Sequence, residues 1–305
     1  MSAAAETVGG ALTRPAPRLS FFGTVGAEAR KVRGQRSTLA ILGGGVLLWV
    51  GVMLLLSLSG RGSPETLMRH TPAALVATWR DILYTVFTMG SGIVLLLTTA
   101  RLVGMEYSLG TIRILLARGT GRVSLLLAKL VVMAVLGVVM LAAFAAASAV
   151  WVGADALRWT GSLNALRTLP VSTLHDLELG LLMSLMSMGC AILIGSAAAT
   201  LGRSVAFGVG VALGLFPADN FGTTILGLLT LLTKQQFWSQ VTAYLLGPNL
   251  NALPSHWITG RKVATALTPP LVRIDLTHAL VVVAAWALAL FLLQVILTWR
   301  RDVLA

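Results

Sequence analysis

The side chains that most often do chemistry in proteins are sparse in this sequence, and their spacing predicts neither a catalytic site nor a metal site. The four histidines lie too far apart for the three- or four-residue spacing that a helical metal site needs. No glycine is followed by a lysine, so the loop that binds ATP phosphates in many enzymes is missing. We therefore expect no enzyme activity, cofactor or metal in this chain, and any nucleotide that drives it must bind to another chain. The residues considered are His70, His175, His256, His278 and the single cysteine, Cys190.

The most informative polar residues lie between positions 104 and 124. A short amphipathic helix is predicted at about 111–117, with Ile112 on its apolar face and Arg113 off that face. Such a helix between two membrane spans suits docking into a groove on a cytoplasmic partner. The alternative is an ordinary basic loop that only stabilises the topology.

The composition indicates which kind of secondary structure surrounds residues 104–124. Of the 305 residues, 56% are hydrophobic and only 11% are charged, whereas soluble domains carry about a quarter charged residues. This excludes an ordinary soluble enzyme and a disordered protein. The formal charge of +12 would suggest nucleic acid on a soluble protein. Here the basic residues flank long apolar runs, so membrane lipid and topology explain them and no nucleic-acid partner is expected.

We predict an all-α integral membrane protein in which residues 1–17 form a loose tail and residues 18–305 form one transmembrane domain. About 20 apolar residues are needed to cross the hydrocarbon of a bilayer, and six runs meet that length. The predicted spans are about 37–60, 82–103, 130–153, 179–202, 204–233 and 276–299.

Lysines and arginines favour the side of the N-terminus, so both termini are predicted to be cytoplasmic, in the inner cell membrane. Before the first span, an amphipathic helix at 19–34 is predicted to lie on the inner leaflet, with Phe21, Phe22, Val25 and Ala29 on its apolar face. The alternative is a solvated basic linker. Residues 235–275, between the fifth and sixth spans, are predicted to lie outside and to be partly re-entrant.

The stretch from 104 to 124 resembles that of ABC-2 type transporter permeases, which commonly show Glu-Tyr, then Gly-Thr-Ile-Arg, then further arginines and a lysine. Gly119 departs from the family pattern, in which many members have proline here. The matching residues are Glu106, Tyr107, Gly110, Thr111, Ile112, Arg113, Arg118, Arg122 and Lys129.

This resemblance implies the transmembrane subunit of an ABC exporter that moves a hydrophobic or amphipathic cargo outward. Such a subunit works as a dimer, either with a second copy or with a sister permease, on a pair of separate ATPase subunits that bind ATP and Mg²⁺. The residues from Glu106 to Arg122 would form the element that couples the permease to the ATPases. In the second span, the candidates for lining the transport cavity are Tyr84, Phe87, Met89 and Ser91.

The fifth span carries two further features. Gly210 and Gly214 are spaced as helices that approach closely often require, which predicts a dimer contact or, alternatively, packing within one subunit. Pro217 should break the span, with Asp219 beside the break in the outer half of the bilayer. Asp219 would face a wet vestibule, cap the half-helix that begins near Phe221, or act as an outer gate.

Two other classes of function stay open from the sequence. One is an ion- or proton-coupled secondary transporter, in which Asp219 would be the titrating group within the membrane. The other is a membrane subunit that transports nothing and serves in immunity or assembly.

Overall fold

The computed structural model describes residues 20–58, 72–117, 119–161, 163–167, 169–257 and 268–300, and all regular elements within these ranges are helices. The predicted tail at 1–17 lies outside them. In chain order the helices are α1 Phe21–Gly34, α2 Arg36–Leu58, α4 Pro72–Ser108, α5 Thr111–Ala117, α6 Arg122–Thr160, α7 Asn164–Arg167, α8 Val171–Gly202, α9 Val205–Thr233, α10 Phe237–Val241, the 3₁₀ turn η2 Thr242–Tyr244, α11 Leu246–Trp257 and α12 Leu276–Arg300.

Among the described residues, five helices are long and apolar enough to cross a membrane. They are α2, α4, α6, α8 and α12. The last four each contain a predicted span, and α2 covers the span predicted at 37–60 except for its last two residues, which lie outside the described residues. In α4, α6 and α8 the helix extends well beyond the predicted span. The predictions stopped at charged residues, but charged side chains at the ends of a span can leave the hydrocarbon or pair with one another. Arg80 of α4, for example, donates to Asp176 of α8 at 2.7 Å.

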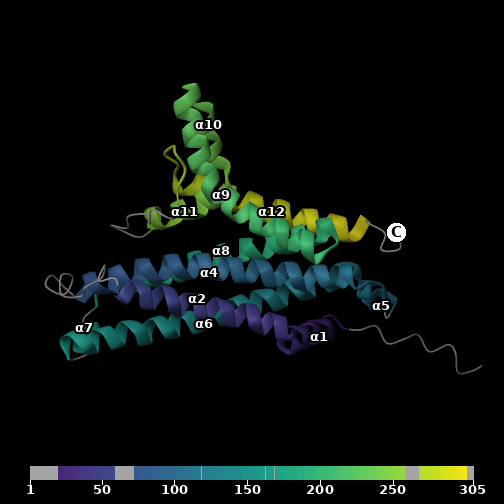
Figure 1. The fold of residues 1–305 in the computed structure, drawn as a ribbon, viewed down its shortest axis with the longest axis horizontal. Helices are drawn as coiled ribbons and strands as arrows, with labels where there is room; N and C mark the ends of the chain where they lie inside the picture. The colour runs from purple at the N-terminus through teal and green to yellow at the C-terminus, as the bar shows by residue number, and fades with distance from the viewer. Residues whose placement is uncertain are drawn as a thin grey trace, which may run out of the picture.

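The fifth predicted span coincides with α9. The prediction that Pro217 interrupts this helix is wrong. The backbone is helical without a gap from Val205 to Thr233. Figure 1 shows that the first part of α9 runs beside the bundle and that its later part rises away from it, together with α10. Proline removes one helical hydrogen bond and commonly bends a helix without ending it. The side chains at 216, 217 and 220 lie outside the described residues.

The two short predicted helices that flank the spans are both present. Ser20 caps the start of α1, because its hydroxyl accepts the backbone N–H of Gly23. α5 occupies Thr111–Ala117, as the apolar spacing predicts. Gly110 precedes α5 with φ of +65°, a conformation that glycine adopts without steric cost. In Figure 1, α1, α5 and the end of α12 lie at one end of the bundle, and α7 lies at the other end.

The segment after α9 folds back onto the bundle through α10, η2 and α11. α11 is buried at Leu246–Asn249 and Ala252–Pro254, and it packs against α8, α9 and α12. The carbonyl of Ala243 accepts the Nδ2–H of the fully buried Asn249 at 2.7 Å and lies 2.9 Å from Nε2 of His278. These contacts fasten the segment to the start of α12. The depth of α11 in a bilayer stays a prediction.

Close packing holds α4 against α8 and α9. A Cβ at Gly195 of α8 would lie 2.6 Å from the carbonyl oxygen of Leu96, and a Cβ at Gly104 of α4 would lie 2.8 Å from the backbone of Val205. Only glycine permits such close contact between helix backbones, so α8 and the start of α9 pack directly against α4.

Candidate functional site

Four charged side chains meet where α1, α4 and α6 converge, and we call them the charged cluster: Glu28, Lys31, Glu106 and Lys129. Lys129 Nζ lies 2.7 Å from Glu28 Oε2 and 2.9 Å from Glu106 Oε1. Lys31 Nζ lies 2.5 Å from Glu28 Oε1 and 2.7 Å from Glu106 Oε1. Each lysine therefore bridges both carboxylates, and the cluster has no net charge.

Burial makes the members of the charged cluster interdependent. Glu28 is 1% exposed, Lys129 is 3% exposed and Glu106 is 6% exposed. A buried charge costs several kcal/mol unless partners compensate it, so each group depends on the others. Burial alone would lower the pKa of Lys31, but its hydrogen bonds to Glu106 and Glu28 outweigh that effect and raise the pKa above its ordinary value of 10.5. The cluster thus ties α1 to the ends of two long helices.

The charged cluster determines where the carboxylates of Glu106 and Glu28 point. The carboxylate of Glu106, a candidate for contact with an ATPase, points into the protein and is held by lysines. Glu28 lies on the buried face of α1 with Thr24 and Val32. The exposed face of α1 instead carries Phe22 and Ala29. One sequence signal could have revealed the burial of Glu28. Glu28 and Lys31 lie one turn apart on a predicted helix, with no other acidic residue nearby in the sequence.

Five of the predicted coupling residues gather around a cavity of about 350 Å³ beside α5, which we call the α5 cavity. Thr111 does not line it, and Arg118 lies outside the described residues. Arg113 is exposed, whereas Ile112 is buried and anchors α5 to the bundle. Thr200 of α8 and Leu297 and Thr298 of α12 also line it, and none of these was predicted from the sequence. The five predicted residues are Tyr107, Gly110, Ile112, Arg113 and Arg122.

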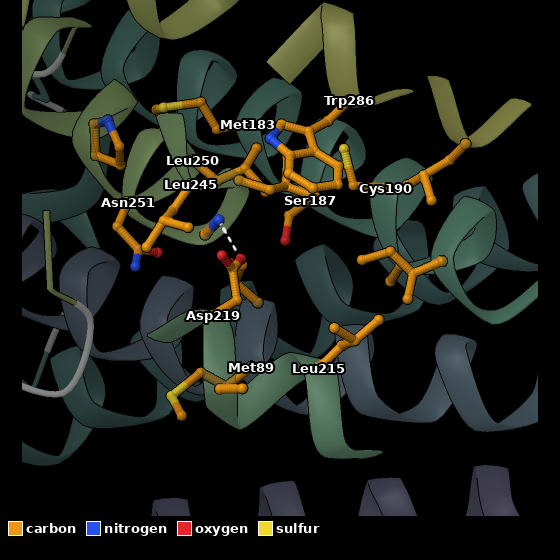
Figure 2. Close-up of a pocket in the computed structure, with 18 of the residues that line it drawn as sticks. Met89, Met183, Ser187, Cys190, Leu215, Asp219, Leu245, Leu250, Asn251 and Trp286 are labelled. Atoms are coloured by element: carbon orange, nitrogen blue, oxygen red, sulfur yellow. Dashed lines mark hydrogen bonds between the residues drawn. The ribbon is translucent and has the colours of Figure 1, made fainter. Parts of the chain in front are cut away.

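A second cavity of about 320 Å³, the central pocket, lies among α4, α8, α9, α11 and α12. Figure 2 shows the carboxylate of Asp219 directed towards the backbone of Gly247 in α11, and Ser187, Trp286, Met89 and Leu215 also line the pocket. Asp219 is the only carboxylate or basic group among the described lining residues. The rest of the lining is mainly apolar, which suits an apolar or amphipathic molecule.

Asp219 has a structural partner that the sequence did not reveal. Its carboxylate accepts the backbone N–H of Gly247, in the first turn of α11 (Figure 2). A carboxylate there satisfies an amide that has no partner within its own helix. The side chain therefore caps α11, rather than the later half of its own helix near Phe221. The outer-gate role stays a prediction.

The structure separates the four residues expected to line a transport cavity. Tyr84 and Met89 line the central pocket. Phe87 instead stacks on Phe144 of α6, with ring centroids 3.7 Å apart, and Ser91 is buried with its hydroxyl directed at a carbonyl of its own helix. Hydropathy predicted the whole of 82–103 as a span, but it could not show which face of α4 packs against α6. The residues missed include Met183, Ser187, Asn251 and Trp286.

The two spaced glycines of α9 lie on its exposed side. A Cβ at Gly210 or Gly214 would have no neighbouring atom within 4 Å, whereas a Cβ at Gly208 would lie 2.9 Å from Cα of Ala199. Gly208 therefore supplies the close contact within this chain. The dimer contact at Gly210 and Gly214 stays a prediction.

Taken together, the described residues form an all-helical protein with five helices that could span a membrane, of the multi-pass membrane class. No protein-family model matches the chain, and no curated protein matches it.

Proposed function

We propose that this chain is the transmembrane permease subunit of an ATP-driven exporter of the ABC-2 type. The observation that carries the proposal is α5, a short helix between α4 and α6 at the same end of the bundle as α1. Its first residues, Thr111 to Arg113, and Gly110 just before them lie within the stretch that resembles ABC-2 permeases. ATP and Mg²⁺ would bind to a pair of partner ATPase subunits.

The surface of α5 supports docking to a partner. Ile114 is 56% exposed and the neighbouring Leu109 is 66% exposed, so apolar side chains project beside the exposed Arg113. An apolar contact rimmed by a charge is the usual composition of a protein interface. Closure of the ATPases on ATP would push on α5, and the charged cluster would pass that movement from α4 to α1 and α6.

The central pocket supports the transport part of the proposal. It lies among α4, α8, α9, α11 and α12, and its lining is mainly apolar, with Asp219, Ser187 and Asn251 among the polar groups. A hydrophobic or amphipathic cargo fits such a lining. For the alternative of proton-coupled transport, the same pocket offers one carboxylate, which is already engaged by the backbone of α11. That arrangement favours the exporter.

Co-purification from native membranes tests the proposal. The full chain, extracted in mild detergent, should carry an ATPase with a phosphate-binding loop, identified by mass spectrometry. Arg113→Ala and Ile114→Asp should reduce the recovered ATPase severalfold, because a few anchors dominate such contacts. Arg30→Ala is the matched control, because Arg30 is exposed on α1 at the same end of the bundle. Reproducible absence of any ATPase would contradict the proposal.

A further inference from the structure

The carboxylate of Asp219 in the central pocket has neutral partners only, within the part of the chain that the structure describes. It accepts the backbone N–H groups of Gly247 and Leu246, and it forms no ion pair there (Figure 2). The start of α11 supplies only about half an elementary charge of the opposite sign. A negative charge therefore remains at the wall of a pocket whose other walls are mainly apolar, and a cation bound there would compensate it.

A hydroxyl in the same lining lacks a hydrogen-bond partner. Thr88 of α4 lines the central pocket, and its Oγ1 is buried and has no partner among the described residues. A buried polar group without a partner costs free energy, and a ligand N–H that donates to this oxygen would remove that cost. A protonated amine carries only donors, so its chemistry complements both a carboxylate and a hydroxyl oxygen.

The remaining lining suits an apolar body attached to the cation. Met89 of α4, Met183 of α8 and Leu250 of α11 approach the pocket from three sides of the chain. Methionine side chains adapt their shape to the group that they contact. The indole of Trp286 also lines the pocket and is held there by its Nε1–H, which donates to the carbonyl of Tyr244 at 2.9 Å. Indole rings attract organic cations.

An inorganic cation would use only a small part of this lining. Ca²⁺ and Mg²⁺ in proteins take about six oxygen ligands or more. The central pocket instead places one carboxylate beside thioether, aliphatic and aromatic side chains in a volume of about 320 Å³. A cavity of that size is typical of sites for small organic molecules. The lining therefore favours an organic cation over a metal ion.

We infer that the central pocket binds an amphipathic organic cation, whose protonated amine pairs with Asp219 and whose apolar body lies against the methionine and leucine side chains. In the exporter proposed above, this molecule is the cargo. That role rests on the proposed function, whereas binding to this chain does not.

Asp219→Asn isolates the charge, because it keeps an oxygen that can accept the N–H of Gly247. Asp275 gives a matched control. It accepts the backbone N–H of His278 at the start of α12, at 3.2 Å, and it does not line the central pocket. Asp275→Asn therefore removes the same charge from the same kind of cap, at a different place.

Thr88→Val isolates the hydroxyl and nearly keeps the shape of the side chain. Because this hydroxyl has no partner among the described residues, its loss should not lower the stability of the chain. Thr99, on the same helix, also has a hydroxyl without a partner in the described structure, but it does not line the pocket. Thr99→Val is therefore the matched control for Thr88→Val.

The experiment uses the full chain in nanodiscs of phosphatidylcholine and three probes of equal chain length: decylammonium, decanol and decanoate, each carrying a photoreactive diazirine. Mass spectrometry of the peptides locates the crosslinks after illumination, and unlabelled probe competes for the site. Decylammonium should label the helices of the central pocket saturably, about tenfold more strongly than decanol, because one buried charge gains a partner. Decanoate should label them least.

The variants decide whether this labelling comes from the proposed site. Asp219→Asn should reduce labelling by decylammonium to the level of decanol, and Thr88→Val should reduce it severalfold. Asp275→Asn and Thr99→Val should label as the original chain does. Equal labelling by decylammonium and decanol would overturn the inference. So would labelling by decylammonium that survives Asp219→Asn, or that falls as much in Asp275→Asn.

These measurements need no ATPase, so the two proposals fail separately. If binding depends on Asp219 but no ATPase is recovered from native membranes, only the exporter proposal is contradicted. If an ATPase is recovered but no binding depends on Asp219, only the inference of a cation site is contradicted.

Discussion

Glu28 and Lys129 are 101 residues apart in the chain, and their side chains form an ion pair of 2.7 Å in which both partners are buried. The pair joins the first helix of the fold to the start of α6, and Lys129 also donates to the backbone carbonyl of Leu102 in α4, at 3.3 Å. Three helices thus meet at one ammonium group. We expect this contact to fix the position of α1 relative to the long helices.

Removal of one partner from this pair should cost far more than removal of both. Lys129→Met leaves Glu28 and Glu106 sharing a single lysine, and we expect the free energy of unfolding to fall by about 3–5 kcal/mol. Lys129→Met combined with Glu28→Leu removes a charge of each sign and should restore most of that loss. Unfolding of the purified chain in detergent measures both. A single variant as stable as the original chain would show that the pair has no such role.

Glu106→Ala should differ from Arg113→Ala, although both residues belong to the predicted coupling stretch. Glu106 is buried between two lysines, so its loss should lower the thermal stability of the chain even without a partner. Arg113 is exposed, so its loss should leave stability within about 0.5 kcal/mol. Thermal unfolding of the two purified variants measures this difference in stability. Equal stability would mean that Glu106 acts only through a partner.

The raised pKa of Lys31 predicts loss of stability in alkali. Because the folded pKa exceeds the ordinary value of 10.5, the stabilising contribution is complete below that pH and is lost as the pH rises through the folded value. The stability difference between the original chain and Lys31→Met should therefore be constant up to about pH 10 and shrink above it. Thermal unfolding of both chains across this range measures it. A difference that grows with pH would contradict the assigned sign.

Substitutions at Asp219 should distinguish a cap from a proton carrier. Asp219→Asn keeps an oxygen that can accept the backbone N–H of Gly247, so folding and most transport of an uncharged cargo should be retained. Asp219→Ala removes the cap and should cost about 0.5–2 kcal/mol. Thermal unfolding and a transport assay in vesicles measure the two effects. Loss of uncharged-cargo transport in a well-inserted Asp219→Asn variant would favour the proton-coupled alternative.

The glycines of α9 should respond differently according to the side of the helix on which they lie. Gly208→Ala places a Cβ 2.9 Å from the backbone of Ala199, and we expect a cost of about 1–3 kcal/mol. Gly210→Ala and Gly214→Ala meet open space and should not lower the stability of the isolated chain.

If Gly210 and Gly214 contact a second permease, cysteines at these positions should cross-link across the dimer, whereas a cysteine at Gly208 should not. The cross-linked fraction on a denaturing gel measures this contact. Absence of cross-linking at both Gly210 and Gly214 would place the dimer contact elsewhere.

Hydropathy and helix signals in the sequence were sufficient for α1, α5 and the five helices that are long enough to span a membrane. Apolar runs of spanning length predicted α2, α4, α6, α8 and α12, because the backbone of an apolar segment in a membrane must satisfy its hydrogen bonds internally. The local spacing of polar and apolar residues likewise predicted α1 and α5. These features depend on neighbours in the chain, so the sequence alone determines them.

Tertiary structure decided which side chains meet. The pairing of Glu28 with Lys129, and of Asp219 with the first turn of α11, joins segments whose relative rotation no local pattern specifies. Likewise, only packing turned Phe87 towards α6 and left Tyr84 in the central pocket. The physical reason is that an apolar helix in a membrane has little difference in hydropathy between its faces. Its rotation is therefore set by close contacts such as those of Gly195 and Gly208, and by buried charges that must find their partners.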